Sequence, residues 1–326
     1  MSALRTCRRA FALAELLATV TVVAAVLAVY IVLSSRSRAM AALGESVTNL
    51  RQLTTGYLQY GQDNQSRIAT FSWRAGEFHA GYPLASSDLQ AAAYQAVSIM
   101  RTRANMPQIP IVTGWNPYIY YGHLSLLDYF GYELPTRLAI SPEDKQRLSW
   151  ALDRSRWGTQ GSTNYRWAFS SSYEGPYELF SATGMIDQSG YEYNQLSIHG
   201  NDWGRRRLDE ITFPSFKALL YDRHQRHFGP RQAFFMHQEA RIPVASADGN
   251  VAIRRSEHGN PGWQPRNPSS DQASMISYRP SSSGAFAWDP PALDPSGTDI
   301  VPGRYRYTRG ASPVAILMHP KRPEPV

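Results

Sequence analysis

The sequence predicts an α+β protein, in which one long N-terminal helix precedes a large, β-rich globular domain that also contains short helices. Three observations support this. An apolar run occupies residues 11–33, apolar side chains then recur at helical spacing to residue 63, and the remaining chain is rich in aromatic residues and turn signals.

The apolar run from Phe11 to Leu33 carries one charge, Glu15. At about 1.5 Å per residue a helix over this run is roughly 34 Å long, which exceeds the ~30 Å hydrocarbon core of a bilayer. Basic residues flank the run on both sides: Arg5, Arg8, Arg9, Arg36 and Arg38. The small excess before the run weakly favours a cytoplasmic N-terminus.

A secretory signal peptide is an alternative for this region. Its apolar core usually has about 7 to 15 residues, so this run is long, although Ala39 and Ala41 keep ordinary cleavage open. Glu15 lies near the start of the run, where its carboxylate can reach the headgroups. A charge at the bilayer centre costs about 3 kcal/mol, which is why acids within a span usually have a partner or a function.

The helical pattern continues past the apolar run. Apolar or aromatic residues recur three or four positions apart at Met40, Leu43, Val47, Leu50, Leu53 or Thr54, Tyr57 and Tyr60. This spacing predicts an amphipathic half over 34–63, and hence one helix over 11–63 of roughly 80 Å. Gly44 and Gly56 are its expected weak points, because each costs about 1 kcal/mol relative to alanine.

The segment from Arg8 to Leu17 resembles the N-terminus of type IV pilins and type II secretion pseudopilins. The resemblance implies a leader over 1–10 that a prepilin peptidase removes between Ala10 and Phe11, followed by methylation of the new amine. Ala10 stands where the family usually has glycine. Glu15 becomes the fifth mature residue, and in this family that acid pairs with the amine of a neighbouring subunit.

The same resemblance implies a structural subunit of a pilus or of a secretion pseudopilus. We expect it to be stored in the bacterial inner membrane with its head in the periplasm, and then assembled by an inner-membrane platform into a filament with copies of itself or related subunits. The helices would bury these residues in the filament core: Leu13, Leu16, Leu17, Val20, Val23 and Leu27. Shorter segments, at 141–144, 213–215 and 248–263, resemble large pseudopilin-like proteins of planctomycete-type bacteria.

Residues 64–326 form the predicted head, without an evident linker between two domains. We expect helices over 89–106, with Ser87 or Asp88 as cap, over 124–130, and after Ser141, and strands over 66–73, 217–221, 232–236, 241–245, 251–254 and 304–309. Asp248-Gly249 predicts a hairpin turn. A Pro-, Ser- and Gly-rich stretch at about 260–302 predicts a long surface loop.

Cysteine content and net charge narrow the possible class of protein further. Cys7 is the single cysteine and belongs to the leader, so a processed chain has no disulfide. The formal net charge of +7 falls to +4 when Arg5, Arg8 and Arg9 leave with the leader (7 − 3 = 4). Basic residues are scattered and no nucleic-acid module is present, so we expect no nucleic-acid partner.

Weak metal-ligand candidates are Asp222, His224 and His227, which form a D-x-H-x-x-H run, and Asp248 with Asn250. Surface histidines and a tight turn explain these residues without an ion, so we predict no metal site. Glu143 and Asp144 are interpreted as a helix cap, not as an acid pair. No phosphate-binding loop, nucleophile elbow or zinc-protease motif occurs, and we therefore expect no enzyme activity and no cofactor.

Clustered aromatics leave a second class of function open. Trp115, Tyr118, Tyr120, Tyr121, Tyr191, Tyr193 and Trp263 lie among Pro, Gly and Asn, as in sugar-binding loops, although large aromatics more often fill a core. The rival to a filament subunit is therefore a monomeric, membrane-anchored protein that binds a carbohydrate or surface ligand, or that acts as a hydrolase.

Overall fold

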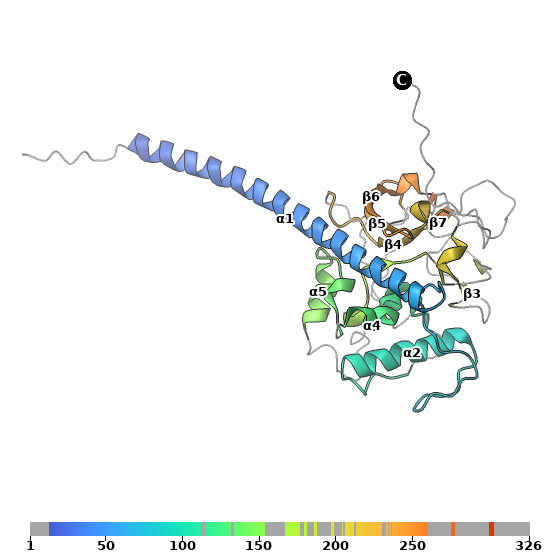
Figure 1. The fold of residues 1–326 in the computed structure, drawn as a ribbon. Helices are drawn as coiled ribbons and strands as arrows, with labels where there is room; N and C mark the ends of the chain where they lie inside the picture. Colours follow the sequence, from blue (N-terminus) through green and yellow to red (C-terminus); the bar gives the residue numbers. More distant parts are fainter. Residues whose placement is uncertain are drawn as a thin grey trace, which may run out of the picture.

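The computed structural model describes residues 13–111, 115–131, 134–153, 167–176, 179–180, 186–187, 197–198, 204, 206–211, 213–229, 233, 235, 237–259, 275–277 and 300–302. The fold is α+β, as predicted. Helix α1 (Leu13–Asp63) projects from a head whose first half is helical and whose second half carries a small antiparallel sheet (Figure 1).

The helical half of the head follows α1 directly. Its elements are α2 (Asp88–Arg103), α3 (Tyr118–Tyr121), η1 (Gly122–Leu126), α4 (Leu127–Phe130), η2 (Arg137–Ala139), α5 (Lys145–Leu152) and η4 (Trp167–Phe169). Ser87 caps α2, accepting a hydrogen bond from the Gln90 N–H, which confirms the predicted start. Helix α5 begins three residues later than expected from Pro142, because Asp144 caps it and not Ser141.

The sheet has the strand order β1-β4-β5-β6, all antiparallel. Its strands are β1 (Tyr173–Glu174), β4 (Ala218–Asp222), β5 (Arg241–Ser246) and β6 (Val251–Arg255), so the expected strands near 217–221, 241–245 and 251–254 are confirmed. Gly249 has φ +92° and the Asp248 carboxylate accepts the Asn250 N–H at 3.0 Å, which makes the predicted hairpin turn. Short 3₁₀ turns flank the strands: η6 (Leu208–Glu210), η7 (Pro214–Phe216) and η8 (Ser256–His258).

Two expectations were wrong in detail. Residues 66–73 form no strand, because their pairing is limited to one bridge, between Arg67 and Arg207. The predicted loop at about 260–302 contains a strand pair, β7 (Met275–Ser277) with β8 (Ile300–Pro302). A second short pair joins β2 (Ile186–Asp187) and β3 (Ser197–Ile198). The strand expected at 304–309, and most of that at 232–236, lie outside the described residues.

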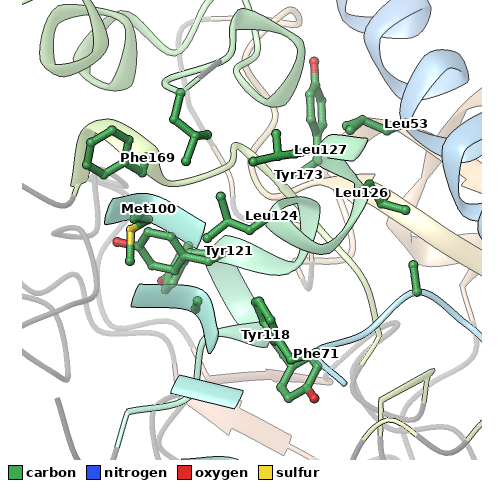
Figure 2. Close-up of a cluster of buried hydrophobic side chains, with 14 of the residues drawn as sticks. Leu53, Phe71, Met100, Tyr118, Tyr121, Leu124, Leu126, Leu127, Phe169 and Tyr173 are labelled. Atoms are coloured by element: carbon green, nitrogen blue, oxygen red, sulfur yellow. The ribbon is translucent and has the colours of Figure 1, made fainter. Parts of the chain in front are cut away.

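The core lies where the C-terminal half of α1 passes between the sheet and helices α2, α4 and α5 (Figure 1). Leu53 of α1, Met100 of α2, the rings of α3 and the leucines of η1 and α4 belong to one buried cluster there (Figure 2). The ring of Tyr118 contacts Phe71 edge-on at 5.2 Å and stacks on Phe180 at 5.0 Å. Packing of this kind, without a disulfide, positions the head on α1.

Two of the three glycines of α1, Gly44 and Gly56, have different surroundings, which gives a matched test. A Cβ at Gly44 meets nothing within 4 Å, whereas one at Gly56 lies 2.3 Å from the Phe130 ring. We expect Gly44→Ala to stabilise the chain by about 0.5 to 1 kcal/mol through helix propensity. Gly56→Ala should instead destabilise it by about 1 to 3 kcal/mol through overpacking. Urea unfolding of the detergent-solubilised chain measures both, and equal effects at the two sites would contradict the role given to Phe130.

Candidate membrane-facing assembly surface

The N-terminal half of α1 is an exposed apolar rod. Every described side chain from residue 15 to residue 31 is exposed, and an 18-residue window of the helix has a mean hydropathy of 2.7 with none of it buried. In the part of the chain that the structure describes, one helix is long and apolar enough to cross a membrane. Its length, hydropathy and N-terminal position are those of a membrane anchor or a signal sequence.

The apolar residues expected in a filament core lie on this rod. Their exposed fractions are 55% for Leu16, 60% for Leu17, 58% for Val20, 50% for Val23 and 53% for Leu27. Burial of a leucine or valine side chain is worth about 1.5 to 3 kcal/mol relative to water. An apolar surface that extends along the whole rod therefore needs lipid or other protein around it.

Glu15 lies in the first turn of α1, and its backbone carbonyl accepts the Thr19 hydroxyl at 2.7 Å. Its side chain is exposed, at the end of the rod farthest from the head. Leu13 begins the helix, while Ala10 and Phe11, the expected processing site, lie outside the described residues. The structure thus places the acid at the tip of the rod and leaves the cleavage site a prediction.

The head begins later on α1 than the sequence predicts. Met40 was expected on the packed face, yet it is 66% exposed, and the first buried side chain is Leu43 at 5%. Leu50, Leu53 and Tyr57 follow at 2% or less, as the spacing predicts. Residues 34–42 therefore form a largely exposed, more polar section of about 14 Å between the apolar rod and the head.

Two polar contacts fix how α1 sits on the head. The Ser46 hydroxyl is hydrogen-bonded to the Tyr173 hydroxyl at 3.0 Å, and both residues are buried. The Asn49 amide donates to the Ile140 carbonyl at 3.3 Å. Because these bonds are directional, they fix rotation and register in a way that the apolar core alone does not.

A buried ion cluster lies beyond Tyr173, in the loop before α5 and at the end of β4. The Asp144 carboxylate accepts hydrogen bonds from Arg147 Nη1 at 2.6 Å, Arg226 Nη2 at 2.9 Å and the Ser172 hydroxyl at 2.7 Å. Burial alone would raise the pKa of Asp144, but Arg226 and Arg147 hold it below its ordinary value. Asp144 was predicted only as a helix cap, and these partners were missed.

Asp222 shares Arg226 with Asp144: Arg226 Nη1 pairs with Asp222, and Nη2 pairs with Asp144. Burial raises the pKa of Asp222 to about 6, and Arg226 offsets this only in part. His224 Nδ1 lies 3.2 Å from Arg226 Nη2, and burial lowers the pKa of His224 well below its ordinary value. The D-x-H run is thus part of an arginine-centred cluster.

The weak metal candidates do not converge on one point. Asp222 bonds Arg226 and the His224 N–H, while His227 Nε2 lies 3.4 Å from the Ser141 hydroxyl. Asp248 is exposed in the hairpin turn. Among the described residues, no three His, Cys, Asp or Glu side chains are placed to hold a metal ion.

The aromatic residues considered for sugar binding fill the core. Exposed fractions are 1% for Trp115, 2% for Tyr118, 8% for Tyr120 and 0% for Tyr121. The guanidinium of Arg223 lies over the Tyr120 ring at 4.3 Å. Tyr191, Tyr193 and Trp263 lie outside the described residues. The described members of the set therefore cannot present an aromatic platform to a ligand.

His123 makes stability depend on pH. It is 6% exposed, lines a cavity of about 10 Å³ beside Tyr57 and Phe180, and burial lowers its pKa to about 3. The unfolded chain takes up this proton below about pH 6.5, and the folded chain only near its own lower pKa. The stabilisation is therefore complete above pH 6.5 and is lost as the pH falls towards 3, by about 2 kcal/mol between pH 7 and pH 5.

We expect His123→Leu to remove that loss, so that its free energy of unfolding falls less than the parent's between pH 7 and pH 5. Urea unfolding at both pH values, followed by tryptophan fluorescence, measures the difference. Comparison with the parent cancels the contribution of Asp222 to the pH dependence. Its raised pKa changes the free energy of unfolding in the opposite direction between about pH 4 and pH 6. His258→Leu, at a partly exposed histidine, is the control. An unchanged pH dependence in His123→Leu would refute the assignment.

Comparison with models of known families, with curated proteins and with solved structures finds no match for this chain. Function therefore has to be argued from the geometry. That geometry combines an exposed apolar rod, an acid at its tip and a head held in fixed register on the same helix.

Proposed function

We propose that this chain is a pilin-like structural subunit, processed at its N-terminus and assembled through the apolar half of α1. The observation that carries the proposal is the division of one continuous helix: residues 15–31 are exposed and predominantly apolar, and residues 43–63 hold the head. A rod of this kind can be stored in a membrane and later bundled with identical rods without refolding.

Two interactions would drive assembly. Lateral packing of residues such as Leu16, Val20 and Leu27 supplies affinity. The Glu15 carboxylate supplies register, because a charge left unpaired in an apolar bundle costs several kcal/mol. Its partner in the proposal is the amine of Phe11 on a neighbouring copy, exposed when a prepilin peptidase removes residues 1–10.

The other parts of the proposal follow from this role. The chain is held in a bacterial inner membrane with its head in the periplasm, and an assembly platform moves it into a pseudopilus or a surface pilus. Its partners are lipid, the peptidase, the platform and its own or related copies, not nucleic acid. The role is structural, with no catalysis and no cofactor.

Mass spectrometry of the native protein tests the proposal. We expect the N-terminal peptide to begin at Phe11 and to carry one extra methyl group. An intact Met1, or a start after Ala39, would overturn the processing step. Electron microscopy of sheared surface material and of envelope fractions tests assembly: periodic fibres that contain the chain support a subunit, and a purely membrane-bound monomer supports the anchored binding protein or hydrolase instead.

A further inference from the structure

A polar pocket lies at the end of α1 farthest from the apolar rod. It has a volume of about 520 Å³, opens to solvent, and is lined by the end of α1, the segment that follows it, one side of α2, and η1 with α4. This volume is within the range of sites that hold small organic ligands. The pocket does not overlap the apolar rod or the Asp144 ion cluster.

Hydrogen bonds among its lining residues hold the pocket open in one shape. Gln95 accepts the N–H groups of Ser72 and Trp73, at 2.6 and 2.9 Å, and donates to the Ser72 hydroxyl at 3.0 Å. Asn64 donates to the Tyr129 hydroxyl at 3.3 Å. A lining already fixed by such bonds loses little side-chain entropy when a ligand binds.

The other polar groups of the lining, which those hydrogen bonds do not involve, are hydroxyls and one ion pair. Gln95, Ser98 and Thr102 lie on one stripe of α2, and within the described part of the chain the hydroxyls of Ser98 and Thr102 make no hydrogen bond. Arg103 and Asp128 pair with each other, with side chains 39% and 79% exposed. Arg103 keeps N–H donors and Asp128 keeps acceptor lone pairs for a ligand.

The apolar part of the lining comes from Ile99, Leu124 and Leu127 and from two tyrosine rings. The rings of Tyr60 and Tyr129 lie 5.8 Å apart and tilted by 59°, and both residues are half-buried. A tyrosine ring offers a flat apolar face beside a polar edge. Such a face suits the C–H side of a pyranose ring.

We infer that this pocket binds a neutral saccharide. The Arg103–Asp128 pair leaves the lining without net charge, which favours neither an anion nor a cation. An apolar ligand would leave the hydroxyls and the ion pair desolvated without partners, at a cost for each group. A ligand with several hydroxyls and one apolar face satisfies both parts of the lining, and the volume limits it to a short oligosaccharide or to the end of a longer glycan.

The pocket also lies where a glycan outside the cell would be met. Tyr60 is 27 residues beyond Leu33 (60 − 33), which is about 40 Å along the helix from the end of the apolar rod. Saccharide binding itself depends on the head alone, and only its extracellular setting rests on the proposed function. A chain that never forms filaments would still bind the saccharide, so the two proposals fail independently.

The test uses the full chain, solubilised as a monomer in a detergent without a sugar headgroup. A printed array of neutral, sialylated and sulfated glycans, together with a random peptide array, is probed first. The best neutral glycan is then titrated by calorimetry against the parent and the Ser98→Ala/Thr102→Val double variant. Thr55→Val, on the exposed face of α1, is the matched control.

We expect neutral glycans to be bound in preference to sialylated or sulfated ones. Removal of the two hydroxyls should raise the Kd by about tenfold or more, since each hydrogen bond contributes a few-fold to affinity, and Thr55→Val should leave it unchanged. No glycan binding, a preference for charged glycans or for peptides, or an unchanged Kd in the double variant would each overturn the inference.

Discussion

Glu15→Ala is expected to leave the chain in the membrane and to abolish or greatly reduce its incorporation into filaments. Removal of an acid near the start of an apolar run makes membrane insertion more favourable. In the bundled state the same change removes the group that we propose to pair with a neighbour's amine. The variant should therefore accumulate as a membrane-bound monomer, and fractionation with electron microscopy of sheared material measures the ratio of the two pools.

The control for this experiment lies on the same helix. Glu45→Ala removes an exposed acid from the section that carries the head, outside the apolar rod, and should assemble like the parent. Normal filaments from Glu15→Ala would refute the role given to the carboxylate. Equal loss in both variants would point to general damage to α1 and would equally count against that role.

The sequence correctly predicted the elements whose signals lie close together in the chain. The recurrence of Leu43, Leu50 and Tyr57 predicted the packed face of α1, Ser87 predicted the start of α2, and Asp248-Gly249 predicted the β5–β6 turn. Each of these signals lies within a few residues of the structure that it produces. The start of the head was misplaced because Met40 fits the same helical spacing, although Met40 is exposed among the described residues.

Long-range pairing left no comparable signal in the sequence. Asp144 and Arg226 are 82 residues apart, and nothing near Asp144 distinguishes a buried ion partner from a simple helix cap. Residues 66–73 alternate like a strand, but Arg207 offers them only a single bridge. The polar pocket was missed for the same reason, because its lining comes from segments between Tyr60 and Tyr129 that only the fold brings together.

Asp144→Asn is expected to destabilise the head by about 3 to 5 kcal/mol. Asparagine is as good a helix cap as aspartate, so the bond to the Arg147 N–H can persist while the charge is lost. Arg147, 4% exposed at its side chain, would then lack its anionic partner, and Arg226, 1% exposed, would keep only Asp222. Removal of one partner of a buried ion pair costs about this much. Urea unfolding of the detergent-solubilised chain at pH 7 measures the change.

A surface pair provides the matched comparison. Asp209→Asn removes the charge that pairs with Arg207 at the surface, where both side chains are nearly half exposed and an ion pair contributes little, and should leave the unfolding midpoint close to the parent's. If Asp144 acted only as the cap of α5, Asp144→Asn would be equally silent, and that result would contradict the cluster as a stabilising element. If the cluster also fixes Tyr173 against Ser46, Asp144→Asn should expose the α1–head contact to proteolysis before the core unfolds, because Ser172, which bonds the carboxylate, immediately precedes Tyr173.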